Sequence, residues 1–173
     1  MLQVPNEEAQ VSLADQLINA YLPLPVAAKF PIQDRLYDAL IAGDLATLER
    51  HIKALFAAIP WRNFTNNDLP ETEGYYACVL YAFFASLNAT IIPEDISSHG
   101  QADLTVMPGD YIYVMEIKRD DAIEYRAQSP NSSLEQIRDR GYADKYRASG
   151  KTVVELVLIF NSHARNLVQM DWQ

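Results

Sequence analysis

The sequence predicts an α/β domain in which helices cover a central mixed β-sheet. Two observations indicate this class. Near residue 88 the hydrophobic period changes from the three- and four-residue spacing of helices to the alternation of strands. A helical segment then separates two strand-like segments, which is typical of a crossover between parallel strands. The length of 173 residues suits one compact domain.

The first sixty residues are predicted to be helical. A helix is expected over 11–21 and ends before Pro23, because proline cannot donate to the helix behind it. A second helix is expected over 33–42. Asp44 is placed to cap a third helix, which Pro60 closes.

The remaining chain alternates between helix and strand. An apolar helix is expected over 71–87, and a second helix is expected to run from Ser132 or Ser133 to about residue 148. The Pro108-Gly109 pair fits a tight turn with proline at its first central position. The strands are expected over 90–96, 101–107, 111–118, 152–160 and 165–172, the last as an edge strand.

The charge balance bears on the class of partner. Lys and Arg number 14 against 23 Asp and Glu, a net charge of −9, which disfavours a protein that coats nucleic acid by charge alone. Residues 116–151 nevertheless hold eight of the 14 basic residues. This stretch is either a solvated helix of mixed charge or a local surface that faces an anion.

Cysteine content and hydropathy indicate a cytoplasmic protein. The single cysteine, Cys78, cannot form an internal disulfide and is expected in the core of its apolar helix. No basic segment followed by an apolar run opens the sequence, so a secretory signal is not expected. The apolar run 77–87 is far shorter than the ~20 residues that cross a bilayer.

The strand over 111–118 contains the most informative charges. Both of its faces are apolar, yet it ends in Glu116 and Lys118, which share one face. Burying a carboxylate and an ammonium there is costly unless they pair or bind something. The alternative is that both side chains simply emerge into solvent at the strand end.

Asp103 lies on the preceding strand, and a hairpin would bring it near Glu116. Strand alternation places Ala102 and Leu104 on one face and Asp103 on the other. Two carboxylates and a backbone carbonyl form a hard-oxygen site suited to Mg²⁺. Lys118 could then polarise a phosphate or assist a water.

This Asp103…Glu116-Ile117-Lys118 constellation resembles the metal-binding signature of the PD-(D/E)XK nuclease superfamily, which has the restriction-endonuclease-like fold. An ordered set of motifs resembles, more closely, the C-terminal nuclease-like domain of predicted prokaryotic AAA-ATPase-like proteins. The motifs are Glu73-Gly74-Tyr75-Tyr76, Gly100-Gln101-Ala102-Asp103-Leu104, Glu116-Ile117-Lys118, Gln136-Ile137 and Gly141-Tyr142. The segments 4–8 and 17–24 resemble the linker and first helix that follow the ATPase domain.

The resemblance implies an αβββαβ core over 63–173, with an N-terminal helical segment over 1–62 packed on it. It also implies a Mg²⁺ or Mn²⁺ cofactor and a role for each matching residue. The metal ligands would be Asp103, Glu116, the carbonyl of Ile117 and the helix acid Glu73; the catalytic set would add Lys118 and Gln136; Tyr142 would line a secondary pocket.

Two substitutions depart from the family pattern, and one acid has a second explanation. Ala102 stands in place of the proline of the family name, and Gln101 stands where an arginine often precedes the motif, which removes a phosphate contact. Glu73 is equally explained as an acid favoured at a helix N-terminus. Arg138 and Arg140 share the predicted helix with Gln136 and could meet a phosphodiester backbone. Lys145, Arg147 and Lys151 extend this basic stretch.

Three functions follow as hypotheses. The first is a metal-dependent nuclease acting on nucleic acid, expected to be DNA. The second is a nuclease-like docking module for an ATPase or nucleic acid, and the third is a structural domain with a simple Glu116–Lys118 ion pair. The resemblance implies an ATPase domain in cis or in trans, but the chain has no Gly-x-x-x-x-Gly-Lys loop. It is therefore expected to be a piece of a longer protein or a stand-alone relative, with no membrane partner and with a homodimer left open.

Overall fold

The computed structural model describes residues 26–60, 71–87, 89–121 and 141–173, and the single positions 12, 16 and 19, which are helical. The helix expected over 11–21 otherwise lies outside the described residues. The elements in chain order are α2 (Val26–Ala42), α3 (Leu45–Ala57), α4 (Glu73–Phe84), β1 (Thr90–Ser97), β2 (Gly100–Met107), β3 (Tyr111–Arg119), the short 3₁₀ helix η3 (Asp144–Tyr146), β4 (Thr152–Asn161) and β5 (Asn166–Trp172).

The five strands form one sheet in the order β1-β2-β3-β4-β5. Neighbouring strands are antiparallel except β3 and β4, which are parallel from Tyr111↔Thr152 to Arg119↔Phe160. A parallel pair requires a crossover, and the chain between Arg119 and Thr152 provides it. The predicted mixed sheet is confirmed, and β5 is an edge strand as expected.

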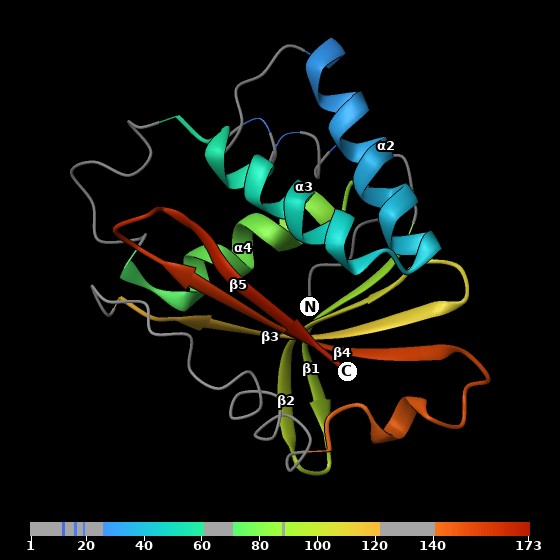
Figure 1. The fold of residues 1–173 in the computed structure, drawn as a ribbon. Helices are drawn as coiled ribbons and strands as arrows, with labels where there is room; N and C mark the ends of the chain where they lie inside the picture. Colours follow the sequence, from blue (N-terminus) through green and yellow to red (C-terminus); the bar gives the residue numbers. More distant parts are fainter. Residues whose placement is uncertain are drawn as a thin grey trace.

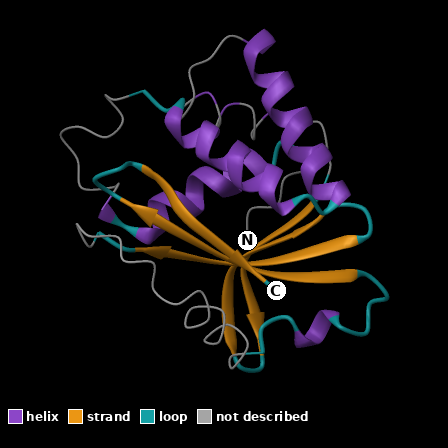
Figure 2. Cartoon of the chain, viewed as in Figure 1, coloured by secondary structure: helices purple, strands orange, loops and turns teal. Residues whose placement is uncertain are grey.

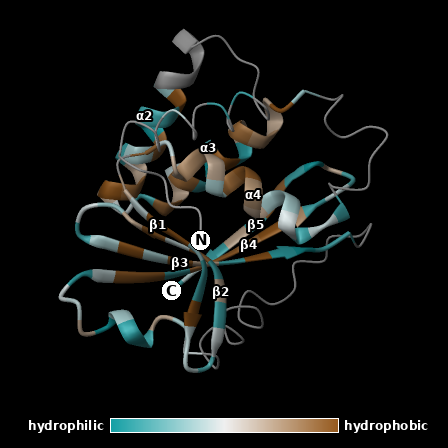
Figure 3. Ribbon diagram, turned by 180° about the vertical axis from the view of Figure 1, so that it is seen from behind, coloured by the Kyte–Doolittle hydropathy of each residue, from teal (hydrophilic) through white to brown (hydrophobic). Residues whose placement is uncertain are grey.

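Helices α2, α3 and α4 lie on one face of the sheet, and the segment with η3 lies on the other (Figures 1 and 2). Helix α4 contacts β1, β2 and β3, and α3 contacts β5. The main core lies between these layers, where the ring of Tyr76 stacks on Phe160 with a centroid distance of 4.5 Å. Figure 3 shows hydrophobic residues, coloured brown, along the strands and the helices that face them, whereas η3 is coloured mainly as hydrophilic.

The helix caps follow the sequence closely. The Asp44 carboxylate accepts a hydrogen bond from the amide of Thr47 at 3.0 Å and so caps α3. Gly43 adopts a φ of +66°, the left-handed conformation with which α2 ends. Helix α2 begins earlier than predicted, at Val26, and contains Pro31 in its second turn. Proline has no backbone N–H, so Pro31 cannot donate one of the hydrogen bonds near the start of the helix, and the helix tolerates this loss.

Two local predictions are wrong. The amide of Tyr111 donates to the carbonyl of Pro108 at 3.0 Å, so Gly109, with a φ of +52°, is the first central residue of the β2–β3 turn. A two-residue hairpin loop needs a positive φ at this place, which proline cannot adopt. The helix predicted to reach residue 148 does not do so, because Gly141 has a φ of +56° and only η3 follows it.

No helix among the described residues is long and apolar enough to cross a membrane.

Candidate functional site

The side-chain alternation of β2 is interrupted at Asp103. Ala102 packs in a second cluster with Val114, whereas Leu104 packs in the main core, although residues two apart in a regular strand share a face. On β1, Glu94 lies between the residues that pair with Ala102 and Leu104, and it has a φ of +49°. The predicted common face of Ala102 and Leu104 is therefore wrong. Such an irregularity re-aims a side chain, and here that side chain is Asp103.

The Asp103 carboxylate binds the backbone of the neighbouring strand. The regular pairing of β2 with β3 ends at Leu104↔Met115, and beyond it the amide of Ile117 donates to Asp103 Oδ2 at 2.7 Å. The Asp103 side chain thus accepts a hydrogen bond from a β3 amide that lies beyond the regular pairing with β2. This bond fixes the carboxylate beside the end of β3, next to Glu116 and Lys118.

Glu116 and Lys118 form an ion pair at the end of β3. Lys118 Nζ lies 2.8 Å from Glu116 Oε1, and their side chains are 37% and 7% exposed respectively. The two residues are two apart in one strand, so both side chains leave the same face. The alternative in which both side chains simply emerge into solvent does not hold for Glu116, because its buried carboxylate pairs with the half-exposed ammonium of Lys118.

Glu73 reaches the same region from α4. Thr72 caps the helix through a hydrogen bond from the amide of Tyr75 to its hydroxyl at 3.2 Å, which places Glu73 in the first turn. Glu73 Oε1 accepts a hydrogen bond from the amide of Arg119 at 3.1 Å. The Arg119 guanidinium in turn donates to the carbonyl of Glu71. These contacts tie the start of α4 to the end of β3.

The charges of these side chains act on one another. Burial raises the pKa of Asp103, and the nearby carboxylates of Glu116 and Glu73 raise it further, against the opposing effects of the Ile117 amide and Lys118. Burial acts to lower the pKa of Lys118, but the hydrogen-bonded Glu116 carboxylate, together with Glu73 and Asp103, outweighs burial and raises it. The site therefore holds acids whose negative charges repel each other, and a lysine that stays cationic.

The donor set fits a divalent cation. Asp103 and Glu116 provide two carboxylates from adjacent strands, and the carbonyl of Ile117 lies between Glu116 and Lys118 in the chain. Hard oxygen ligands of this kind are what Mg²⁺ prefers, with water and substrate phosphate completing its coordination. In the ranges that the structure describes, no three His, Cys, Asp or Glu side chains gather closely enough to form a metal cluster. Glu73 binds the Arg119 amide in this arrangement, so its role as a ligand stays a prediction.

A pocket of about 370 Å³ lies beside Asp103, between α4 and the irregular part of β1 and β2. Asp103 and Glu94 line it from the sheet, and Ala77, Cys78 and Tyr81 line it from α4. Cys78 is exposed here, so its predicted place in the core is wrong. The buried face of α4 includes Tyr76, Val79, Leu80 and Phe83, and Cys78 lies outside it.

The other predicted site residues stay predictions. Gln136, Arg138 and Arg140 lie outside the described residues. Tyr142 is 5% exposed and packs in the second cluster with Ala102, with its ring against Gly100. Its ring contributes packing at this position.

The described basic residues of the 116–151 stretch contact the protein's own acceptors. Arg147 Nε lies 2.9 Å from Asp144 Oδ1, and Lys151 Nζ donates to the carbonyl of Gly109 at 2.8 Å. Lys145 binds Asp95, as described below. The cationic groups of these three residues therefore bind acceptors within the protein and stabilise the segment between β3 and β4. One of the two readings of the sequence had expected this stretch to face the phosphates of a nucleic acid.

Asp95 anchors a buried polar cluster that sequence analysis missed. The carboxylate, 5% exposed as a residue, accepts hydrogen bonds from Thr105 Oγ1 at 2.8 Å and from the Tyr146 hydroxyl at 2.7 Å. Lys145 Nζ lies 2.5 Å from Asp95 Oδ1 and donates to the carbonyl of Ile96 at 2.7 Å. No local signal marks these residues, because 50 residues separate Asp95 from Lys145. The cluster joins β1 through Asp95, β2 through Thr105 and the η3 segment through Lys145 and Tyr146.

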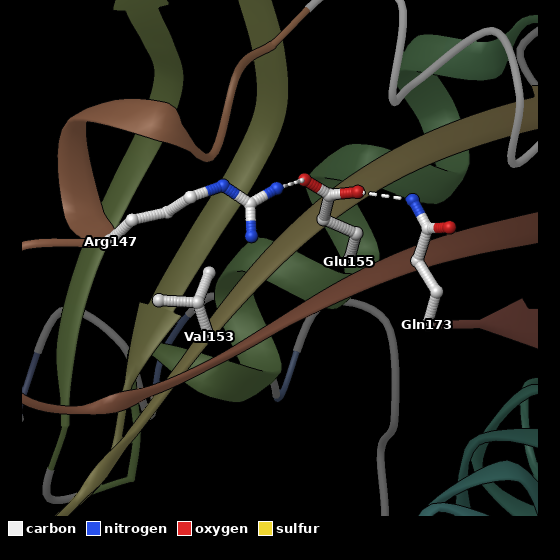
Figure 4. Close-up of a pocket in the computed structure, with 4 residues that line it drawn as sticks. All are labelled: Arg147, Val153, Glu155 and Gln173. Carbon is white, nitrogen blue, oxygen red and sulfur yellow. Dashed lines mark hydrogen bonds and ion pairs between the residues drawn. The ribbon is translucent and has the colours of Figure 1, made fainter.

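A second polar pocket lies at the start of β4. Figure 4 shows the buried Glu155 carboxylate between Arg147 and Gln173, with Val153 beside them. Arg147 Nη2 donates to Glu155 Oε1 at 3.2 Å, and the Gln173 amide donates to the other carboxylate oxygen. The backbones of Glu155 and Gln173 also exchange two hydrogen bonds of 3.2 Å. The acid therefore holds the η3 segment and the chain after β5 against β4.

Comparison with known proteins identifies the family. The family model described as "PD-(D/E)XK nuclease superfamily" matches residues 71–170, which include α4, strands β1 to β4 and most of β5. The chain is 38% identical over 167 residues to a protein of Azotobacter chroococcum mcd 1 described as "Uncharacterized protein in vnfD 5'region". This match covers 96% of the chain but 31% of that relative, so the chain spans about a third of the relative's length. No solved structure matches the chain. From its strand order, its strand-end acids and the matched family model, the chain belongs to the PD-(D/E)XK nuclease superfamily and has its restriction-endonuclease-like α/β fold.

Proposed function

We propose that this protein hydrolyses phosphodiester bonds of nucleic acid, with Mg²⁺ or Mn²⁺ as cofactor and DNA as the substrate. One observation carries the proposal: Asp103 contacts the strand end that presents Glu116 and Lys118, although 13 residues separate the two acids. Members of this superfamily are usually nucleases and typically use divalent metal ions. The assignment of this activity to this chain is ours.

The proposed mechanism assigns separate roles to the acids and the lysine. Asp103, Glu116 and the Ile117 carbonyl would hold the divalent cation, which when bound supplies a water of lowered pKa and charge stabilisation at phosphorus. The Ile117 amide orients Asp103 by donating to it at 2.7 Å. Glu116 orients Lys118 in the same way, at 2.8 Å.

Lys118 acts in this proposal as a positive charge and hydrogen-bond donor. Its pKa is raised, since the Glu116, Glu73 and Asp103 carboxylates outweigh the effect of burial, so the ammonium keeps its proton at neutral pH. It therefore suits the stabilisation of negative charge that develops on a phosphate. Gln136, Arg138, Arg140 and Tyr142 are proposed to contact the substrate or its bound water.

The proposed cellular setting is an ATPase-nuclease protein of the cytoplasm. The match to a relative about three times as long supports a larger protein of which this chain is the nuclease part. We propose that the remaining part is an ATPase domain, and that the boundary at residue 62 separates an N-terminal helical segment from the nuclease core. One hydrophobic cluster that contains both Leu48 and Leu158 supports the proposed packing of the helical segment on the core.

The test compares Lys118→Ala with Lys53→Ala in a cleavage assay on DNA with Mg²⁺ or Mn²⁺. Lys53 is a matched control because it is 40% exposed, pairs with Glu49 at 2.6 Å and lies on α3 away from the site. We expect Lys118→Ala to lose at least 100-fold in rate, in the range that removal of one electrostatic stabiliser costs, and Lys53→Ala to keep the wild-type rate. Equal activity of the two variants would contradict the role of Lys118.

Metal titration separates the ligands from the lysine. By calorimetry we expect Lys118→Ala to retain Mn²⁺ binding and Asp103→Asn to lose it, because the second change removes a charged ligand. A site that survives Asp103→Asn would refute the assigned ligand set.

A second candidate is a nuclease-like docking module that has no catalytic activity. Two observations favour it: Lys145, Arg147 and Lys151 bind the protein's own acceptors, and Gln101 stands where the family often has an arginine. Such a module would bind nucleic acid or an ATPase without a saturable metal site. The calorimetric titration of the wild-type protein distinguishes the two candidates.

A further inference from the structure

We propose that the pocket between α4 and the irregular part of β1 and β2 binds one unstacked nucleobase, next to the phosphate held at Asp103. This inference extends the proposed function by naming the substrate form: a nucleic acid whose base can leave the stack, as in a single strand or a frayed end. The described lining residues that carry the argument are Gly74, Ala77, Cys78, Tyr81, Glu94 and Asp103.

The position of the pocket connects it to the metal site. Asp103 lies in its wall, and the same carboxylate accepts the hydrogen bond from the Ile117 amide at the end of β3. A group seated in the pocket is therefore adjacent to a proposed ligand of the cation. A substrate phosphate at that cation would have its neighbouring sugar and base at the mouth of this pocket.

Size and lining suit a single planar base. The volume of about 370 Å³ lies at the low end of the ~300–1000 Å³ of small-molecule sites, and is far too small for a duplex. Gly74, Ala77 and Cys78 present small side chains from α4, which leave the space open. Tyr81 adds an aromatic ring, and stacking on an aromatic ring is how proteins hold unstacked bases of any sequence.

The charge of the pocket decides which part of a nucleotide enters. Its described lining residues include two acids, Glu94 and Asp103, and no lysine, arginine or histidine. A phosphate is repelled from such a wall, whereas the exocyclic amino group of cytosine or adenine can donate to a carboxylate. The base therefore enters, and the phosphate stays at the cation.

The backbone at Glu94 supports a built pocket wall. Its φ of +49° is a strained conformation for a residue with a side chain, and such strained residues concentrate at functional sites. This conformation accompanies the change of faces at Asp103. The Glu94 carboxylate, a hydrogen-bond acceptor, and Asp103, a proposed metal ligand, thus line the same wall of the pocket.

Cys78 offers a direct test, since it is the single cysteine of the chain, is exposed and lines the pocket. The rate of its alkylation by N-ethylmaleimide is measured in Ca²⁺ with a 12-nucleotide single-stranded DNA, with the same strand in a duplex, and with a 12-nucleotide abasic strand. Fluorescence anisotropy establishes that each probe is bound. We expect the single strand to slow alkylation at least fivefold, and the duplex and the abasic strand to leave the rate within twofold of the free protein.

Each other outcome overturns the proposal. Equal protection by the abasic strand would show that the sugar-phosphate backbone covers Cys78 without a base. No protection by a bound single strand would show that bases do not enter. Because protection is a binding measurement, it is independent of cleavage: protection without cleavage would sustain the base pocket while the proposed nuclease activity failed.

Filling the pocket provides a second measurement. Cys78→Trp is compared with Ala54→Trp, which adds the same side chain at an exposed position of α3 outside the pocket. Circular dichroism confirms that both variants fold. We expect Cys78→Trp to weaken binding of the single strand at least tenfold with Mn²⁺ affinity unchanged, and Ala54→Trp to bind as the wild type. Equal binding by both variants would refute a base in this pocket.

Discussion

The Asp95 cluster predicts a large and specific loss of stability when its charge is removed. Asp95→Asn keeps the shape of the side chain but loses the negative charge that Lys145, Tyr146 and Thr105 share. The change leaves a buried amide next to an ammonium that has lost its counter-ion. It also weakens the attachment of the η3 segment to β1.

The size of the loss follows from the contacts. Two neutral donors, Thr105 and Tyr146, bind a carboxylate that is 5% exposed, and hydrogen bonds to charged groups contribute about 1.5–3 kcal/mol each. The Lys145 side chain is 34% exposed, so solvent screens its pairing, and we assign it less than about 1 kcal/mol. Since asparagine keeps one carbonyl acceptor, we expect Asp95→Asn to lower the free energy of unfolding by about 2–4 kcal/mol.

Urea denaturation followed by circular dichroism measures this free energy. We expect Tyr146→Phe to cost about 1–2 kcal/mol, and the double variant with Asp95→Asn to cost clearly less than the sum of the two. Lys53→Met, which breaks the exposed Glu49–Lys53 pair, is the control, with an expected effect below about 1 kcal/mol. An Asp95→Asn protein within about 0.5 kcal/mol of wild type, the ordinary range of surface changes, would refute the reasoning.

The pH dependence of stability gives an independent check. Burial acts to raise the pKa of Asp95, but hydrogen bonds from Lys145, Tyr146 and Thr105 outweigh it and lower the pKa below 3.8. A lowered folded-state pKa means that this stability is present above pH 3.8 and is lost as the pH falls through the folded-state value. We expect the difference between wild type and Asp95→Asn to shrink in this acid range, and a difference that grows on acidification would contradict the assignment.

Two further stability predictions rest on close contacts. Gly43→Ala places a Cβ 2.5 Å from the Tyr111 hydroxyl at a φ of +66°, so we expect the free energy of unfolding to fall by at least about 1–2 kcal/mol. Gly74→Ala is the control, because its added Cβ has no atom within 4 Å, and we expect its thermal midpoint to be equal to that of the wild type or higher. Equal midpoints for the two alanine variants would contradict this. Tyr113→Phe removes a buried hydrogen bond of 2.6 Å to the Leu40 carbonyl; we expect a loss of about 1–2 kcal/mol in urea, and an unchanged midpoint would show that the carbonyl finds another donor.

Strand positions were predictable because they depend on local alternation. Each predicted strand agrees with the structure to within a residue or so at its ends, as with 111–118 against Tyr111–Arg119. The caps at Gly43 and Asp44 were equally local. The proximity of Asp103 to the end of β3 followed from the short hairpin, which needs no long-range information.

Features that depend on distant parts of the chain were not predictable. The change of faces at Asp103 accompanies the unusual backbone of Glu94, and regular alternation cannot foresee it. The exposure of Cys78 reflects how α4 sits on the sheet, which periodicity alone does not specify. Asp95 looked like an ordinary strand acid, because its partners Lys145 and Tyr146 lie beyond the crossover.

The parallel pairing of β3 and β4 also has a kinetic consequence. Strands β1 to β3 are joined by short turns, and β4 and β5 form a hairpin, so both units close through contacts of low sequence separation. Their junction requires the chain from Arg119 to Thr152 to return to the sheet, and such non-local contacts form slowly. We expect the β3–β4 junction to form last in folding. The acids of the proposed site would then approach each other within the first unit, before β4 encloses Glu116.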